Sequence, residues 1–170
     1  MSADSRANIN TNMTAADLLA QLEFSHFCIV TNLEGVTESM ALTEPQPGGN
    51  PVNRVLGHIV VVRRSLFKMF GLPMPLNIEW AKFYNASWDE VDKTKVLSLA
   101  ELKREELETY EQLKSAIQGF SGNWDERYPE STTDRPQTFG QRAQFFMMHE
   151  AYHAGQLGSL RRVLGLPGKI

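Results

Sequence analysis

The run FFMMHEAYHAGQLGSLRRVLG occupies residues 145–165, and it determines most of what the sequence predicts. His149 and His153 stand at positions i and i+4, so both imidazoles lie on one helix face, about 6 Å apart along the axis. Apolar neighbours indicate that this face points into the protein: Phe145, Phe146, Leu157 and Leu160. Two inward histidines can converge on one metal ion. The alternative interpretation is a pair of hydrogen-bonded core histidines, or a half-exposed pair.

The same run matches the HExxH pattern, in which a zinc protease uses the glutamate as general base. Glu150 is therefore a candidate base, and the alternative is a solvated or interhelical glutamate. The printed chain has 17 residues after His153, and none of them is His, Asp, Glu or Cys. A third protein ligand must then come from upstream, which disfavours a metalloprotease.

Apolar residues recur at helical spacing in four segments of the chain. Possible capping boxes mark three of the starts, at Thr14, Ser98 and Thr138, and the second helix begins at Val52 after a Pro- and Gly-rich stretch. The first pattern continues past Val36 and ends before the stretch 44–51, and the others are expected over about 52–70, 98–120 and 138–165. No segment alternates with period two. The sequence predicts an all-α four-helix bundle with long connections between helices 1 and 2 and helices 2 and 3.

The connection at 73–94 is rich in aromatic residues and is expected to cover the bundle or line a cavity: Trp80, Phe83, Tyr84 and Trp88. A short helix capped by Ser87 is expected within it.

Composition excludes several classes of protein. The chain has 170 residues, a formal charge of −3, and Cys28 as its single cysteine. We therefore expect one domain over 13–170 after a flexible N-terminus at 1–12, with no thiolate metal site and no nucleic-acid partner. No apolar run reaches the length of a membrane span, and no secretory signal is apparent, which predicts a soluble cytoplasmic protein without a membrane partner.

The upstream candidates for a third ligand are His26 and His58, and spacing alone does not choose between them. Gly57 weakens its helix by up to about 1 kcal/mol, and a close backbone approach would explain it. Glu106 interrupts the apolar stripe of the third helix and is a weaker candidate for a carboxylate in the pocket.

Together, NRVLGHI at 53–59 and HEAYHAGQ at 149–156 make the chain resemble the DinB/YfiT-like superfamily. This resemblance implies an up-down-down-up bundle and a divalent metal held by His58, His149 and His153. It leaves His26 as a second-shell or packing residue. Gln156 faces the same side as His153 and is expected either to orient that imidazole or to cap a neighbouring helix end. Zinc and nickel are the metals that suit such ligands best.

The resemblance also implies a metal-dependent enzyme that transfers a low-molecular-weight thiol to a small-molecule electrophile, or a hydrolase. A second hypothesis is a non-catalytic bundle that acts by association, with a homodimer as its simplest form. A metalloprotease comes third.

Overall fold

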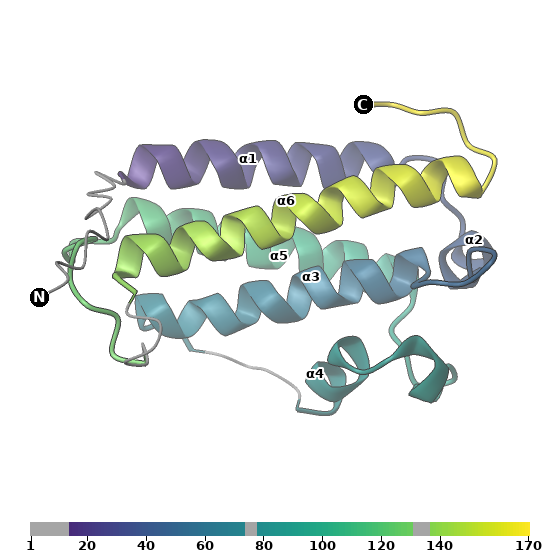
Figure 1. The fold of residues 1–170 in the computed structure, drawn as a ribbon, viewed down its shortest axis with the longest axis horizontal. Helices are drawn as coiled ribbons and strands as arrows, with labels where there is room; N and C mark the ends of the chain where they lie inside the picture. The colour runs from purple at the N-terminus through teal and green to yellow at the C-terminus, as the bar shows by residue number, and fades with distance from the viewer. Residues whose placement is uncertain (1–13, 74–77, 131–136) are drawn as a thin grey trace, which may run out of the picture.

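Four long helices lie side by side in a computed structural model that describes residues 14–73, 78–130 and 137–170 (Figure 1). Helices α1 and α6 run in one direction and α3 and α5 in the other, so the predicted up-down-down-up bundle is confirmed. The elements in chain order are α1 (Ala15–Asn32), α2 (Glu38–Leu42), α3 (Val52–Phe67), the 3₁₀ turn η1 (Lys68–Phe70), α4 (Ile78–Asn85), the 3₁₀ turn η2 (Trp88–Glu90), α5 (Leu99–Gln118) and α6 (Phe139–Val163).

The described residues form no strand; their one β-type contact is an isolated bridge between Arg127 and Thr138. None of the described helices combines the length and the apolar character needed to cross a bilayer. The expected flexible segment 1–12 lies outside the described residues.

The predicted helix starts are confirmed by their capping bonds. The side chains of Thr14, Ser98 and Thr138 each accept a hydrogen bond from the backbone N–H three residues on. The side chain of that third residue in turn accepts a hydrogen bond from the backbone N–H of the capping residue. Gly71 and Gly165 follow the second and fourth bundle helices with positive φ of 67° and 80°, the left-handed conformation that glycine adopts without strain.

Two local predictions need correction. The first helix does not continue to the Pro- and Gly-rich stretch: α1 ends at Asn32, and Gly35, at φ 75°, turns the chain into the separate helix α2, which Thr37 caps. The connection at 73–94 contains α4, which apolar spacing did not predict. The short helix expected after Ser87 exists as η2, but the Ser87 side chain makes no capping bond.

Aromatic side chains of the long connection complete the core. Tyr84 and Trp88 are buried, and Trp80 and Phe83 pack against the apolar cluster to which Tyr84 belongs. The expectation that this segment covers the bundle is therefore correct.

A buried ion-pair network joins three of the bundle helices. The Arg63 side chain on α3 is fully buried and donates from Nε and Nη2 to both carboxylate oxygens of Glu150 on α6, at 2.7 and 2.8 Å. Its Nη1 donates to the carboxylate and the backbone carbonyl of Glu106 on α5, at 2.8 and 2.9 Å. All three charges are thus removed from water but satisfied by hydrogen bonds.

Gly57 has a packing reason for its lack of a side chain. A Cβ at this position would lie 2.2 Å from the ring of Tyr84, which packs across α3 at that point. The ring cannot easily yield, because it is 2% exposed and its hydroxyl accepts a hydrogen bond from the backbone N–H of Leu97. The expected close approach is real, but its partner is an aromatic ring.

We expect Gly57→Ala to lower the free energy of unfolding by about 1–3 kcal/mol, because overpacking against Tyr84 outweighs the better helix propensity of alanine. Gly155→Ala is the matched control: this glycine is also helical, but nothing lies within 4 Å of the added Cβ. The control variant should gain up to about 1 kcal/mol. Urea unfolding of the two metal-free variants measures both effects, and equal stability of the two would contradict the packing argument.

Candidate metal centre

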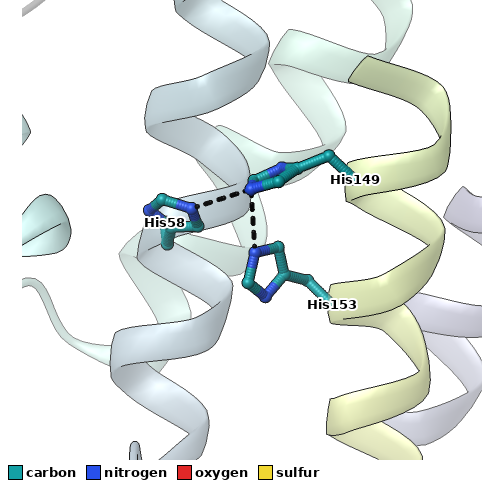
Figure 2. Close-up of side chains that lie close together, drawn as sticks. All are labelled: His58, His149 and His153. Atoms are coloured by element: carbon teal, nitrogen blue, oxygen red, sulfur yellow. Dashed lines mark hydrogen bonds between the residues drawn. The ribbon is translucent and has the colours of Figure 1, made fainter. Parts of the chain in front are cut away.

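Three histidines from two helices meet at one point of the bundle (Figure 2). His58 comes from α3, and His149 and His153 come from successive turns of α6. The Nε2 atom of His149 lies 3.4 Å from Nε2 of His58 and 3.2 Å from Nε2 of His153. In the described part of the chain, this is the group of His, Cys, Asp and Glu side chains whose ligand atoms come within 4.8 Å of one another.

Hydrogen bonds at the far side of two rings set their protonation. His58 Nδ1 lies 2.9 Å from the backbone carbonyl of Tyr84, and His153 Nδ1 lies 2.7 Å from Oε1 of Gln156. Both partners are acceptors, so each Nδ1 carries the proton and each Nε2 presents a lone pair. Nε2 of His149 faces the lone pairs of His58 Nε2 and His153 Nε2, and it can donate a proton to only one of them. The cluster therefore has too few hydrogen-bond donors.

A divalent ion fits this donor set. Nitrogen ligands at about 2.0–2.1 Å from a tetrahedral zinc ion lie about 3.3 Å from each other, close to the two Nε2 separations observed. Neutral imidazole also suits the ions that prefer nitrogen ligands. The three histidines could therefore hold a metal ion, and with three protein ligands such a site keeps at least one coordination position open.

The surroundings keep the imidazoles neutral, which is the ligand form. Burial is the main cause that lowers the pKa of His58 to about 4, and the charge of His153 adds to it. Burial likewise lowers the pKa of His149 and of His153. Protons therefore compete weakly with a metal near neutral pH.

The structure places the other predicted site residues as follows. Gln156 contacts His153 as expected, and its amide nitrogen donates to the hydroxyl of Tyr152 at 3.0 Å. Glu150 turns to Arg63, with both carboxylate oxygens occupied, and is not in the histidine group.

His26 lies on the side of the bundle formed by α1 and α5. Its ring stacks on Tyr110 at 3.8 Å between centroids, and its Nδ1 lies 2.8 Å from a carboxylate oxygen of Glu106. None of these contacts is with the three histidines, so His26 acts here as a packing residue. Glu106 serves the ion-pair network and not the histidine cluster.

Sequence reasoning missed two groups beside the cluster. The Tyr84 carbonyl that holds His58 belongs to an unpredicted helix, although Gly57 marked the place where another segment comes close. Arg54, one turn before His58, is 8% exposed and donates to the carbonyl of Ala86. No pattern in the sequence distinguishes it from a surface arginine.

The metal-free protein is expected to lose stability as the pH falls from about 6.5 to about 4. Over this interval the unfolded chain protonates His58 at its ordinary pKa near 6.5, whereas the folded state binds that proton only near pH 4. Unfolding therefore takes up a proton there, and above pH 6.5 this residue contributes no pH dependence. Guanidinium unfolding of metal-free wild type and His58→Gln across the interval measures the effect. The same pH slope in both proteins would refute it.

Solved structures of low sequence identity share this fold. A protein from Streptococcus pneumoniae aligns over 91% of this chain and 90% of its own, with a TM-score of 0.56 and 16% identity. The colibactin self-resistance protein ClbS, solved in complex with double-stranded DNA, aligns over 89% and 98%, with a TM-score of 0.57 and 18% identity. An uncharacterized protein from Clostridium difficile 630 aligns over 89% and 94%, with a TM-score of 0.55 and 14% identity.

No curated protein is significantly similar to the chain in sequence. The family profile described as the DinB superfamily matches residues 29–157, which is most of the chain and includes all three clustered histidines. The helix order, the fold of the solved structures and this match agree: the chain belongs to the DinB superfamily.

Proposed function

We propose that the protein binds one zinc or nickel ion through His58, His149 and His153 and is a metal-dependent enzyme of the thiol-transfer type. The observation that carries the proposal is the meeting of three Nε2 atoms at ligand spacing, two of them fixed as lone-pair donors. A divalent ion with three neutral ligands keeps its full charge and lowers the pKa of a thiol or water that binds it.

The chain's own residues hold this site in shape. Tyr84 and Gln156 orient two imidazoles from outside, and loss of such partners typically lowers metal affinity about 10–100-fold. In thiol transfer, the sulfur forms a bond to an electrophilic carbon while the bond to the leaving group breaks, and the thiol proton passes to solvent. The protein must supply a thiolate at neutral pH, which an open three-histidine site favours. Hydrolysis by an activated water needs the same site.

Protease chemistry has less support. In the zinc proteases with the HExxH pattern the glutamate acts on a water at the metal. Here both carboxylate oxygens of Glu150 are bonded to Arg63, and removing the carboxylate from that bond would leave a buried guanidinium uncompensated. The geometry thus gives no support to a base role for Glu150.

The metal assignment predicts about one ion per chain in protein reloaded with zinc or nickel after treatment with a chelator. His58→Ala together with His149→Ala should abolish stoichiometric binding, and each single change should weaken it more than about 100-fold, because even an outer partner is worth 10–100-fold. Elemental analysis and chelator competition measure these effects. His26→Ala is the matched control, because His26 lies outside the cluster, and it should bind metal like the wild type. Stoichiometric metal in the double variant would refute the site.

Catalysis is tested on the same proteins with a panel of thiols and a chromogenic aryl halide. Turnover that needs the metal, disappears in His58→Ala and persists in His26→Ala supports thiol transfer. Absence of turnover in metal-loaded wild type across the panel contradicts it.

A second candidate function, association without catalysis, is favoured by an apolar outer face on α1 and α6. Five large side chains there are 50–64% exposed: Phe24, Phe27, Phe145, Met148 and Tyr152. The prediction from apolar spacing that Phe145 points into the protein is therefore wrong. Between Ala143 and Leu160 the only charged residue is Glu150, which is buried. Helices α1 and α6 lie side by side (Figure 1), so these exposed side chains stand on neighbouring helices. An uncharged face of this kind suits a second copy of the same chain, because a two-fold dimer needs a surface that complements itself.

The association hypothesis predicts a dimer that Phe27→Glu together with Met148→Glu converts to a monomer while metal content stays unchanged. Light scattering coupled to gel filtration gives the mass of each form. Leu107→Glu serves as the control, since Leu107 is a comparably exposed apolar residue on α5. A monomeric wild type at high micromolar concentration would rule the dimer out.

A further inference from the structure

Helix α3 carries three buried arginines, and Arg54 differs from the other two in its partners. Arg63 bonds two carboxylates, and Arg64 forms an ion pair with Glu105. Arg54 has the backbone carbonyl of Ala86 as its acceptor, reached by Nε at 3.0 Å and Nη2 at 2.8 Å. Within the described chain no carboxylate pairs with Arg54, and no acceptor contacts its Nη1. Arg54 is 8% exposed as a residue, and its unpaired Nη1 is not shielded from solvent, so the guanidinium keeps one free edge that a ligand can reach.

Arg54 lies beside the histidine cluster. It precedes His58 by four residues, one turn of α3, so both side chains leave the same face of the helix. Both are anchored at the end of α4, His58 on the carbonyl of Tyr84 and Arg54 on that of Ala86. After burial, the positive charge of Arg54 is among the causes that lower the pKa of both His58 and His153. The guanidinium therefore acts on ligands from both helices.

A purely structural role explains part of this arrangement. The carbonyl end of α4 carries partial negative charge, which offsets some of the cost of burying Arg54. Arg161 illustrates the fully structural case, because it is also buried and donates to three carbonyls, those of Asn32 and Glu34 in one segment and that of Pro167 in another. Arg54 has one such carbonyl as its acceptor, so its remaining N–H groups are available to a ligand.

The balance of charges around Arg54 indicates which kind of ligand its free N–H groups would bind. A divalent ion on three neutral imidazoles would place two positive charges next to the guanidinium. The carboxylate nearest in sequence to the ligands, Glu150, is already bound to Arg63. The neighbouring phenol of Tyr84 stays neutral near pH 7, because burial raises its pKa to about 12. The charge of Glu150 still reaches the cluster and acts to raise the pKa of His149 and His153. A bound divalent ion together with Arg54 would outweigh this one carboxylate, and that balance favours an anion.

We infer that Arg54 binds a carboxylate of the molecule whose other end coordinates the metal. This inference rests on the proposed metal site. A planar guanidinium with a free edge matches the geometry of a carboxylate, and one unpaired charge suits a singly charged group. Arg54 is in this sense the residue that selects acidic substrates.

The test compares two probes of equal shape, 3-mercaptopropionate and its uncharged amide, on cobalt-loaded protein. Binding is followed by the absorbance of the cobalt–thiolate bond, so no turnover is needed. Wild type should bind the carboxylate about 10–100-fold more tightly than the amide, the range expected for a charge-assisted hydrogen bond. Arg54→Gln should remove this preference and leave affinity for the amide within about twofold, because Gln can still donate to Ala86.

Two further variants sharpen the result. Arg54→Lys keeps the charge and should keep part of the preference, which also covers the case in which Arg54→Gln unfolds the end of α4. Arg104→Gln removes an exposed cation from α5 and should change nothing. Equal preference in wild type and Arg54→Gln, or no preference in wild type, overturns the inference. If wild type takes up no cobalt, the proposed metal site fails first; if it takes up cobalt and binds both thiols equally, only the inference about Arg54 fails.

Discussion

The buried ion pair between Arg63 and Glu150 is the constraint on which the rest of the site depends. Arg63 follows His58 by five residues on α3, and Glu150 is the immediate neighbour of His149 on α6. Two hydrogen bonds at 2.7 and 2.8 Å fix the position of one helix along the other. A slip of one residue is a rise of about 1.5 Å, which would move His58 Nε2 relative to the two Nε2 atoms on α6. The charges stabilise weakly in net terms, because burying them costs several kcal/mol per ion, but their geometry tolerates little displacement.

The same network shows which role the two buried glutamates have, an ion pair or a place at the metal site, and the sequence alone could not decide between these roles. Glu106 interrupts an apolar stripe and Glu150 belongs to the HExxH pattern, so each was a candidate for the pocket. Both glutamates bind Arg63 and not the histidine cluster, since a carboxylate that left the guanidinium would leave a buried charge unpaired. The candidate metal site is therefore built from neutral ligands and a neighbouring cation, Arg54. This electrostatic character favours anionic ligands over cationic ones.

Local signals in the sequence predicted most of the fold, because each reports on nearby backbone. Capping boxes and terminal glycines located three helix starts and two ends, and the HxxxH spacing placed two histidines on one face. The break after Asn32 was missed because the apolar spacing continues through Leu33 and Val36 into the turn. His26 and His58 could not be distinguished by spacing, since the choice depends on which side of α1 and α3 faces α6. The Arg63 pairs join residues 43 and 87 positions apart, which no local pattern records.

The histidine cluster is held in place from the α5 side and from the α4 side, by a different kind of interaction on each. On the α5 side, hydrogen-bonded charges hold α3 and α6 in register. On the α4 side, Gly57 lets Tyr84 approach, and two backbone carbonyls at the end of α4 orient His58 and Arg54. Carbonyls accept from these side chains without adding a full negative charge, so α4 can fix the ligand and the neighbouring cation while leaving the positive charge uncancelled. A carboxylate in place of the Ala86 carbonyl would hold Arg54 equally well and would remove its capacity to bind an anion. The choice of a backbone acceptor is thus what allows one segment to act both as structural support and as part of a binding site.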